Sequence, residues 1–156
     1  MKNWKELYDS KKMTSDEAIL RFVKSGDKVV FQHDVGEPEE LVRALVRNAE
    51  KFKHVEISHM FSLGPGEYCK EEYKENFHPN IWFVSGQTRK ATNDWGDYTT
   101  CFFHELPELM RQGRVVVDVV FINVSKPDKL GYVSTGVSGD YTVQAIKSAK
   151  KVIAHA

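Results

Sequence analysis

Hydrophobic positions along the chain recur with two alternating periods. Leu41, Val42 and Leu45 follow helical spacing within residues 38–49, whereas positions 55–60 alternate between apolar and polar side chains as a strand does. Residues 16–25 show a second helical face, and residues 29–31 form an apolar run typical of a strand buried on both faces. Residues 16–60 therefore predict helix, strand, helix, strand, a unit that is right-handed in about 98% of known cases.

Capping and turn residues mark the boundaries of these elements. Thr14-Ser15-Asp16-Glu17 has the spacing of a capping box, and Gly26 is well placed to end the helix that follows. Before them, a short amphipathic helix is predicted to lie against the body of the domain through Trp4, Leu7 and Tyr8.

The remainder of the chain continues the alternation less regularly. A loop is predicted at 62–66, a helical turn at 71–76 and a polar excursion at the domain edge at 87–100. Further strands are predicted at 81–84, 101–103, 115–124, 132–133 and from 151, with helices at 107–112 and from 140 or 142 to 149. The aromatic residues Trp82, Phe83, Phe102 and Phe103 are predicted to belong to the core.

Strands that alternate with helices predict the fold class: an α/β domain with an open, mostly parallel sheet and helices on both faces. The length of 156 residues fits one domain spanning residues 1–156. Residues 151–154 resemble a strand that has just begun, which favours a boundary within a longer protein.

Composition narrows the function classes. Twenty-two basic and 22 acidic side chains give zero formal net charge, which disfavours a nucleic-acid partner. The first residues lack the apolar core of a signal peptide, and the longest apolar run, residues 115–124, is too short to span a bilayer, so no membrane association is predicted. Cys69 and Cys101 have no metal or redox spacing, and reduced thiols in a cytoplasmic protein are the expectation.

Candidate chemistry gathers in three polar loops that follow predicted strands, where open α/β sheets usually bind ligands. The first holds His33 and Glu37, and either a general acid–base role or a plain helix-capping loop fits it. The second runs from Ser58 and His59 to a glycine-rich stretch at Gly64, whose backbone N–H groups suit a carboxylate or phosphate, although a surface turn fits as well. No Gly-x-Ser-x-Gly elbow of a serine hydrolase is present, and the six histidines lack metal-ligand spacing, so no metal site is predicted.

The third loop, residues 124–141, places small hydroxyl and glycine residues before a helix start that suits an anion. Taken with residues 33–38 and 58–68, it resembles the acetyl-CoA hydrolase/transferase family, in particular 4-hydroxybutyrate and butyrate or acetate CoA-transferases. The segments YCKEEYKENF (68–77) and FFHELP (102–107) are also similar to that subfamily, and the likeness covers nearly the whole chain.

The resemblance implies two similar α/β domains, of which this chain matches the first. It implies an enzyme that moves coenzyme A between a short-chain acyl-CoA and a small carboxylate through a glutamyl-CoA intermediate, with the thioester as substrate and no further cofactor. The nucleophilic glutamate belongs to the second domain, so no catalytic residue is assigned here and the isolated chain is expected to be inactive. The predicted substrate-binding positions are His33, Glu37, Ser58, His59, Gly64, Ser134, Gly136 and Ser138.

The predicted partners are an acyl-CoA, a small carboxylate, the second transferase domain and, as a further possibility, another copy of the chain. The alternative hypothesis is a non-catalytic module that binds a ligand or partner through the face that the second domain normally covers. A third hypothesis, a stand-alone metal hydrolase, predicts bound zinc.

Overall fold

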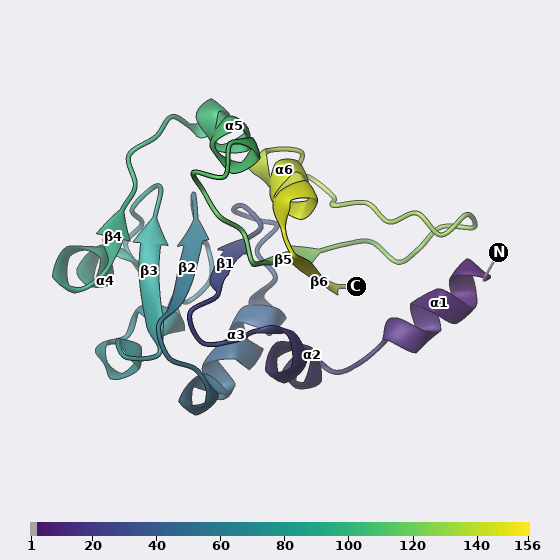
Figure 1. Cartoon of the computed structure of the whole chain (residues 1–156), viewed down its shortest axis with the longest axis horizontal. Coiled ribbons are helices and arrows are strands. Elements are labelled where there is room, and N and C mark those ends of the chain that lie inside the picture. Colours follow the sequence, from purple (N-terminus) through teal and green to yellow (C-terminus); the bar gives the residue numbers. More distant parts are fainter. Residues whose placement is uncertain (1–2) are drawn as a thin grey trace.

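The computed structural model describes residues 3–156 and contains a six-stranded sheet in which every neighbouring pair of strands runs parallel (Figure 1). The strand order is β4-β3-β2-β1-β5-β6. The strands are β1 (Lys28–Phe31), β2 (Val55–His59), β3 (Phe77–Ile81), β4 (Asp97–Tyr98), β5 (Val119–Asn123) and β6 (Lys151–His155). The central strand β1 pairs Val29 with Ile57 of β2 on one side and with Val119 of β5 on the other. The predicted α/β fold with an open parallel sheet is confirmed.

Helices cover both faces of this sheet, as the alternation of buried side chains shows. One core cluster joins Val29 and Phe31 of β1 to α2 (Ser15–Phe22) and α3 (Glu39–Arg47). The other joins the intervening Val30 to α5 (Leu106–Arg111) and α6 (Tyr141–Ser148). Because successive strand residues point to opposite faces, the two clusters lie on opposite sides of the sheet.

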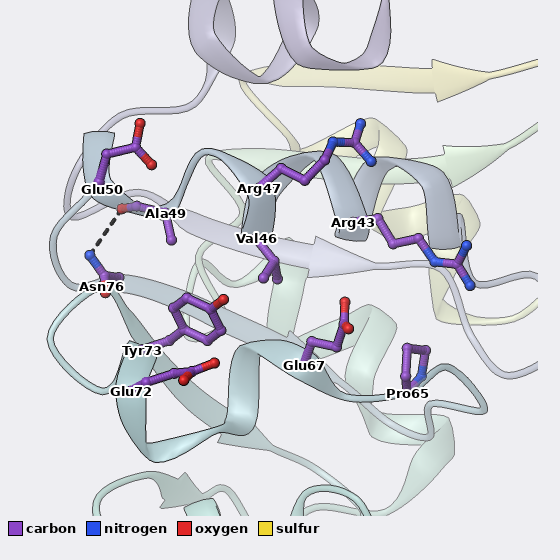
Figure 2. Close-up of a pocket in the computed structure, with 10 residues that line it drawn as sticks. All are labelled: Arg43, Val46, Arg47, Ala49, Glu50, Pro65, Glu67, Glu72, Tyr73 and Asn76. Atoms are coloured by element: carbon purple, nitrogen blue, oxygen red, sulfur yellow. Dashed lines mark hydrogen bonds between the residues drawn. The ribbon is translucent and has the colours of Figure 1, made fainter.

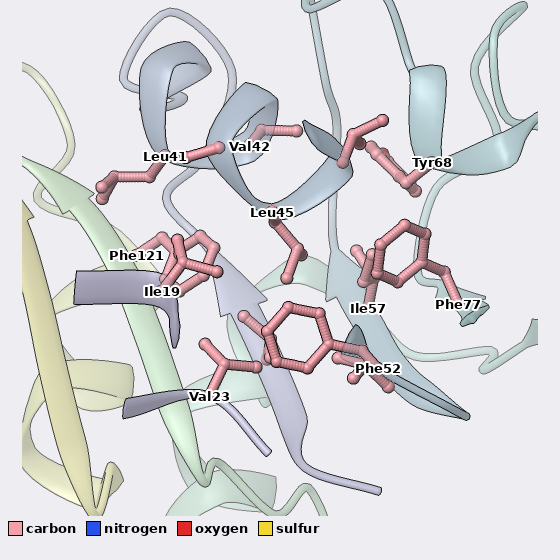
Figure 3. Packing of buried hydrophobic residues seen from close by; sticks show 14 of the residues in the cluster. Ile19, Val23, Leu41, Val42, Leu45, Phe52, Ile57, Tyr68, Phe77 and Phe121 are labelled. Atoms are coloured by element: carbon pink, nitrogen blue, oxygen red, sulfur yellow. The ribbon is translucent and has the colours of Figure 1, made fainter. Parts of the chain in front are cut away.

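The cluster under α2 and α3 holds most of the apolar burial (Figure 3). Leu45 of α3 and Ile19 of α2 are fully buried over the sheet, where they meet side chains such as Ile57 and Phe121. Truncating one such buried leucine to alanine typically costs 2–5 kcal/mol, or about a third of a domain's stability. This packing fixes the sheet on which the loops stand.

The capping prediction for α2 is confirmed. The Thr14 hydroxyl accepts from the Glu17 amide at 3.2 Å, and the Glu17 carboxylate accepts from the Thr14 amide at 2.8 Å. The helix ends earlier than predicted, at Phe22, and Gly26 serves instead in the turn that follows, with a φ of 80°.

The remaining elements are short. They are α1 (Trp4–Lys11), α4 (Arg89–Asp94) and the 3-10 turns η1 (Ala49–Lys51), η2 (Glu67–Cys69), η3 (Glu71–Tyr73) and η4 (Phe103–Glu105). The prediction that α1 packs on the domain body is wrong, because none of its residues is buried. It lies to one side, beside the long loop after β5 (Figure 1). The Trp4 ring lies against Gly131 of that loop.

Several predicted strands are displaced or absent. β3 covers 77–81 rather than 81–84, because Phe77, Pro79 and Ile81 alternate inward although Pro79 and the polar positions weaken the strand pattern. Segments 101–103 and 132–133 form no strand, and β5 covers only 119–123 of the predicted 115–124. The polar stretch 87–100 contains α4 and the two-residue strand β4.

Candidate functional site

The carboxyl end of β1 is braced to the loop after β5 by two buried or half-buried amide side chains. Gln32 accepts from the Asn123 amide at 2.5 Å and donates to the Thr135 carbonyl at 2.9 Å. The Asn123 side chain in turn donates to the Glu37 carbonyl at 3.0 Å. The first and third loops of the sequence prediction are therefore brought together.

Ser138 and Gly36 complete this brace. The Ser138 hydroxyl donates to the His33 carbonyl at 3.3 Å, and the serine is buried. A Cβ at Gly36 would collide with the Ser138 hydroxyl, so only glycine allows the two loops to approach this closely.

The second loop joins through Asp34, which has a φ of 54° and donates its amide to the Phe61 carbonyl at 3.0 Å. Asparagine and aspartate tolerate this left-handed conformation better than most side chains. Asp34 also forms an isolated parallel bridge with Ser62. All three predicted loops thus meet at one edge of the sheet.

Glu37 is a buried carboxyl group at the edge of the sheet where the three loops meet. One of its carboxyl oxygens, Oε2, accepts from the Ser62 hydroxyl at 2.6 Å and from the Gly64 amide at 3.1 Å. The other oxygen, Oε1, has no hydrogen-bond partner among the described residues. A Cβ on Gly64 would lie 2.7 Å from Oε1, so any larger residue there would force the buried Glu37 carboxyl to shift.

Burial raises the pKa of the Glu37 carboxyl above its ordinary value, while the bonds from Ser62 and Gly64 act in the opposite direction. The glycine-loop amide that was expected to suit a carboxylate is therefore occupied by a carboxylate of the chain itself. Glu37 and Gly64 are adjacent as parts of one cluster, and their predicted substrate contacts stay predictions.

An apolar pocket of about 340 Å³ opens beside this cluster. Its lining comes from the segments after β1, β2 and β3 and from η4: His33, Asp34, Met60, Phe61, Phe83 and Phe103. The His33 ring packs 5.1 Å from the ring of Phe103, measured between centroids, and its Nδ1 atom is buried without a partner among residues 3–156. The His33 ring therefore lines a largely apolar pocket, while its unpaired Nδ1 atom is covered by other atoms of the protein.

Ser58 and His59 do not reach this pocket, since both belong to β2 and are buried on opposite faces of the sheet. His59 is fully buried, and its Nε2 lies 2.6 Å from the Tyr68 hydroxyl while its Nδ1 has no partner among the described residues. Burial lowers the pKa of His59 to about 3, so the ring is neutral at physiological pH. The Ser58 hydroxyl lies 3.5 Å from a Glu56 carboxylate oxygen.

Ser134 and Gly136 lie farther out on the third loop. Both are exposed, and the Ser134 hydroxyl accepts from the Gly136 amide at 3.1 Å. The structure thus gathers His33, Glu37, Gly64 and Ser138 from the predicted set, and it places the other four either inside the sheet or on the outer loop.

Sequence reasoning missed the aromatic lining of the pocket. Only Trp82 of the four aromatics expected in the core is buried, whereas Phe83, Phe102 and Phe103 are 55%, 71% and 45% exposed. Placing β3 at 77–81 would have put Phe83 in the loop at the carboxyl end of a strand, where ligand-contacting residues concentrate.

A second, larger pocket of about 790 Å³ lies between α3 and the segments around η2 and η3 (Figure 2). Its arginines are already paired, Arg43 with Glu39 and Arg47 with Asp16 and Glu40, at 2.8–3.0 Å. Glu67 and Glu72 form the opposite rim. The positive charges of both arginines are thus already neutralised by neighbouring carboxylates, and the mixed remainder of the lining points to no particular ligand.

Residues 3–156 contain no group of three or more histidine, cysteine, aspartate or glutamate side chains placed to hold a metal ion. Within the same residues, no helix is long and apolar enough to cross a membrane.

Comparison with known proteins places these observations in a family. The sequence model of the acetyl-CoA hydrolase/transferase N-terminal domain matches residues 1–156. The chain is 49% identical to the 4-hydroxybutyrate coenzyme A transferase of Clostridium kluyveri over 97% of the chain and 35% of that protein. It is 37% identical to the succinyl-CoA:cyclohexane-1-carboxylate CoA transferase of Geobacter metallireducens over 98% of the chain and 36% of that protein.

Solved structures agree. The 4-hydroxybutyrate CoA-transferase of Porphyromonas gingivalis superposes with a TM-score of 0.81 at 36% identity, covering 97% of this chain and 34% of that one. RipA from Yersinia pestis, at 24% identity and a TM-score of 0.86 over 97% of this chain and 38% of its own, shares the fold. The chain spans about a third of the length of the relatives that it matches. By this match along its whole length, the chain belongs to the acetyl-CoA hydrolase/transferase family, in the region that forms the family's N-terminal domain.

Proposed function

We propose that this chain forms one wall of the active-site cleft of a CoA-transferase that exchanges coenzyme A between a short-chain acyl-CoA and a small carboxylate such as acetate, butyrate or 4-hydroxybutyrate. The other wall, with the nucleophilic glutamate, comes from polypeptide beyond these 156 residues. The coenzyme A thioester is a substrate, and the reaction needs no further cofactor or metal. A cytoplasmic location stays a prediction.

The reaction proceeds by covalent catalysis at that glutamate. Its carboxylate attacks the thioester carbonyl, which gives a mixed anhydride and expels the coenzyme A thiolate. The thiolate then attacks the glutamyl carbonyl, forming glutamyl-CoA and releasing the donor acid. The acceptor carboxylate attacks glutamyl-CoA to give a second anhydride, and the returning thiolate takes the new acyl group and frees the glutamate.

The observation that carries this proposal is the apolar pocket of about 340 Å³ at the strand ends. This volume lies at the lower end of the range for small-molecule sites, about 300–1,000 Å³, and therefore favours a short aliphatic chain over a bulky one. Phe61, Phe83 and Phe103 supply apolar contact for such a chain. His33 lines the same pocket, so its ring lies beside a chain bound there.

The test measures coenzyme A exchange between butyryl-CoA and acetate with two proteins. One is the 156-residue chain. The other is a fusion protein in which residues 1–156 replace the matching region of the C. kluyveri transferase, to which they are 49% identical. We expect turnover from the fusion protein and none from the chain alone. Sustained turnover by the chain alone would refute the claim that the nucleophile lies outside it.

A second candidate is a non-catalytic module that binds a partner through the same face. Exposed apolar side chains at the strand ends favour it, among them Val35 at 66% and Phe102 at 71% exposure. Sedimentation of the isolated chain discriminates: a module adapted to stand alone remains monomeric at high concentration, whereas an uncovered domain interface self-associates.

A further inference from the structure

The amino-terminal helix and the long loop after β5 form a joint projection, here called the arm and defined as α1 with residues 124–137. The Trp4 ring would lie 2.9 Å from a Cβ at Gly131, so the helix contacts the distal part of the loop (Figure 1). The loop is itself ordered by backbone bonds, from Ser125 to Ser134 at 2.9 Å and from Asp128 to Tyr132 at 2.8 Å. The arm therefore has a defined shape without belonging to either core.

The arm exposes apolar side chains that the fold does not use. Leu130 and Tyr132 are each 73% exposed and Val137 is 78% exposed, while no residue of α1 is buried. An isolated helix shorter than about 12–15 residues is marginal in water, so the eight-residue α1 needs packing that residues 3–156 do not supply. Burying a large apolar side chain contributes about 1.5–3 kcal/mol, which gives a partner surface a substantial driving force.

The position of β6 indicates what covers the arm. The Val124 amide donates to the His155 carbonyl at 2.9 Å, so the base of the arm lies directly beside the end of β6 (Figure 1). We propose that the arm closes over the polypeptide that follows residue 156 in full-length members of this family and holds it against the strand ends. This rests on the proposed function only in assuming that such a region follows.

A tethered region is favoured over a second copy of the chain as the occupant. A segment continuing from Ala156 starts beside the arm, and short tethers give effective concentrations in the millimolar range. The family relatives supply such a segment, because this chain matches only 35% of the C. kluyveri protein and corresponds to a domain described as N-terminal. The arm carries four lysines and three acidic side chains, so its exposed apolar side chains rather than its charge should set the character of the covered surface.

The test compares backbone amide exchange of the arm in the 156-residue chain and in the fusion protein described above. In the fusion protein we expect arm amides to exchange at least about tenfold more slowly than in the isolated chain. The double change Leu130→Ser with Tyr132→Ser should remove that protection yet leave the urea midpoint of the isolated chain unchanged. Leu20→Ser, on α2 at 48% exposure, is the matched control and should leave arm protection intact.

Equal exchange of the arm in both proteins would overturn the proposal. So would protection in the isolated chain that grows with its concentration, because that result identifies a second copy as the occupant. If the fusion protein is active but its arm amides are not protected, only this inference is refuted. If the arm amides are protected but the fusion protein shows no turnover, only the proposed function is refuted. If the fusion protein fails to fold, residues 3–12 and 124–137 grafted into the C. kluyveri transferase permit the same measurement.

Discussion

Acidification from pH 7 to pH 5 should destabilise the fold by about 2 kcal/mol through His59 alone. The ring is fully buried, and protonation would place a positive charge on it although its Nδ1 atom has no partner among the described residues. The folded pKa is lowered from 6.5 to about 3, so between these values the unfolded chain binds one proton more than the folded chain. The stabilising contribution is thus complete above pH 6.5 and is lost as the pH falls towards 3, at about 1.4 kcal/mol per pH unit.

Urea unfolding at pH 7 and pH 5 measures this loss. His59→Asn removes the titrating ring and should cost stability at both pH values, because the Tyr68 hydroxyl loses its partner at 2.6 Å. The unfolding free energy of the unmodified chain should fall between the two pH values by about 2 kcal/mol more than that of the variant. His104→Asn alters an exposed histidine and serves as the control. An identical pH dependence of the unmodified chain and His59→Asn would refute the reasoning.

Three further substitutions test the strand-end cluster. Gly64→Ala should lower the unfolding free energy, measured in urea, by about 1–3 kcal/mol, because the new Cβ lies 2.7 Å from the Glu37 carboxyl. Gly86→Ala is the control: a Cβ there meets no atom within 4 Å, so the unfolding free energy should change by less than about 0.5 kcal/mol. Because the pKa of the Glu37 carboxyl is raised in the folded state, its ionisation above pH 4.5 destabilises the unmodified chain. The Glu37→Gln variant lacks this ionisation, so its unfolding free energy should rise relative to that of the unmodified chain as the pH increases from 4.5. Parallel pH profiles of the two unfolding free energies would contradict this. Tyr141→Phe should cost about 1–3 kcal/mol by thermal or urea unfolding, because the Phe31 carbonyl loses its buried donor at 2.8 Å; an unchanged midpoint would show that water replaces it.

The regular helices and strands were predictable because burying one face of each element makes apolar residues recur at a fixed spacing in the sequence. Residues 39–47 and 55–59 each bury one repeating set of apolar side chains, and the structure has the expected helix and strand there. β3 was misplaced and β4 was missed for the opposite reason. Pro79 and polar neighbours blur the strand period, and a two-residue strand such as β4 carries no period at all.

The site was predictable only at the level of its loops. Parallel strands bring their carboxyl ends to one edge, which is why His33 and Ser138 lie together although 105 residues separate them. Side-chain direction was not predictable in the same way. His59 is the last residue of β2, and the alternation of the strand directs its side chain into the core beside Tyr68. Because histidine is polar, it was predicted to belong to the binding loop instead.

The single amide of Gln32 has a consequence for motion. Its oxygen accepts from the Asn123 amide and its nitrogen donates to the Thr135 carbonyl, so the segment after β1 is linked both to the end of β5 and to the later part of the loop that follows. Displacing either segment alone requires these hydrogen bonds to break. In the proposed enzyme, any opening and closing around a bound thioester would therefore fall to polypeptide beyond these 156 residues, while this edge of the sheet keeps its shape.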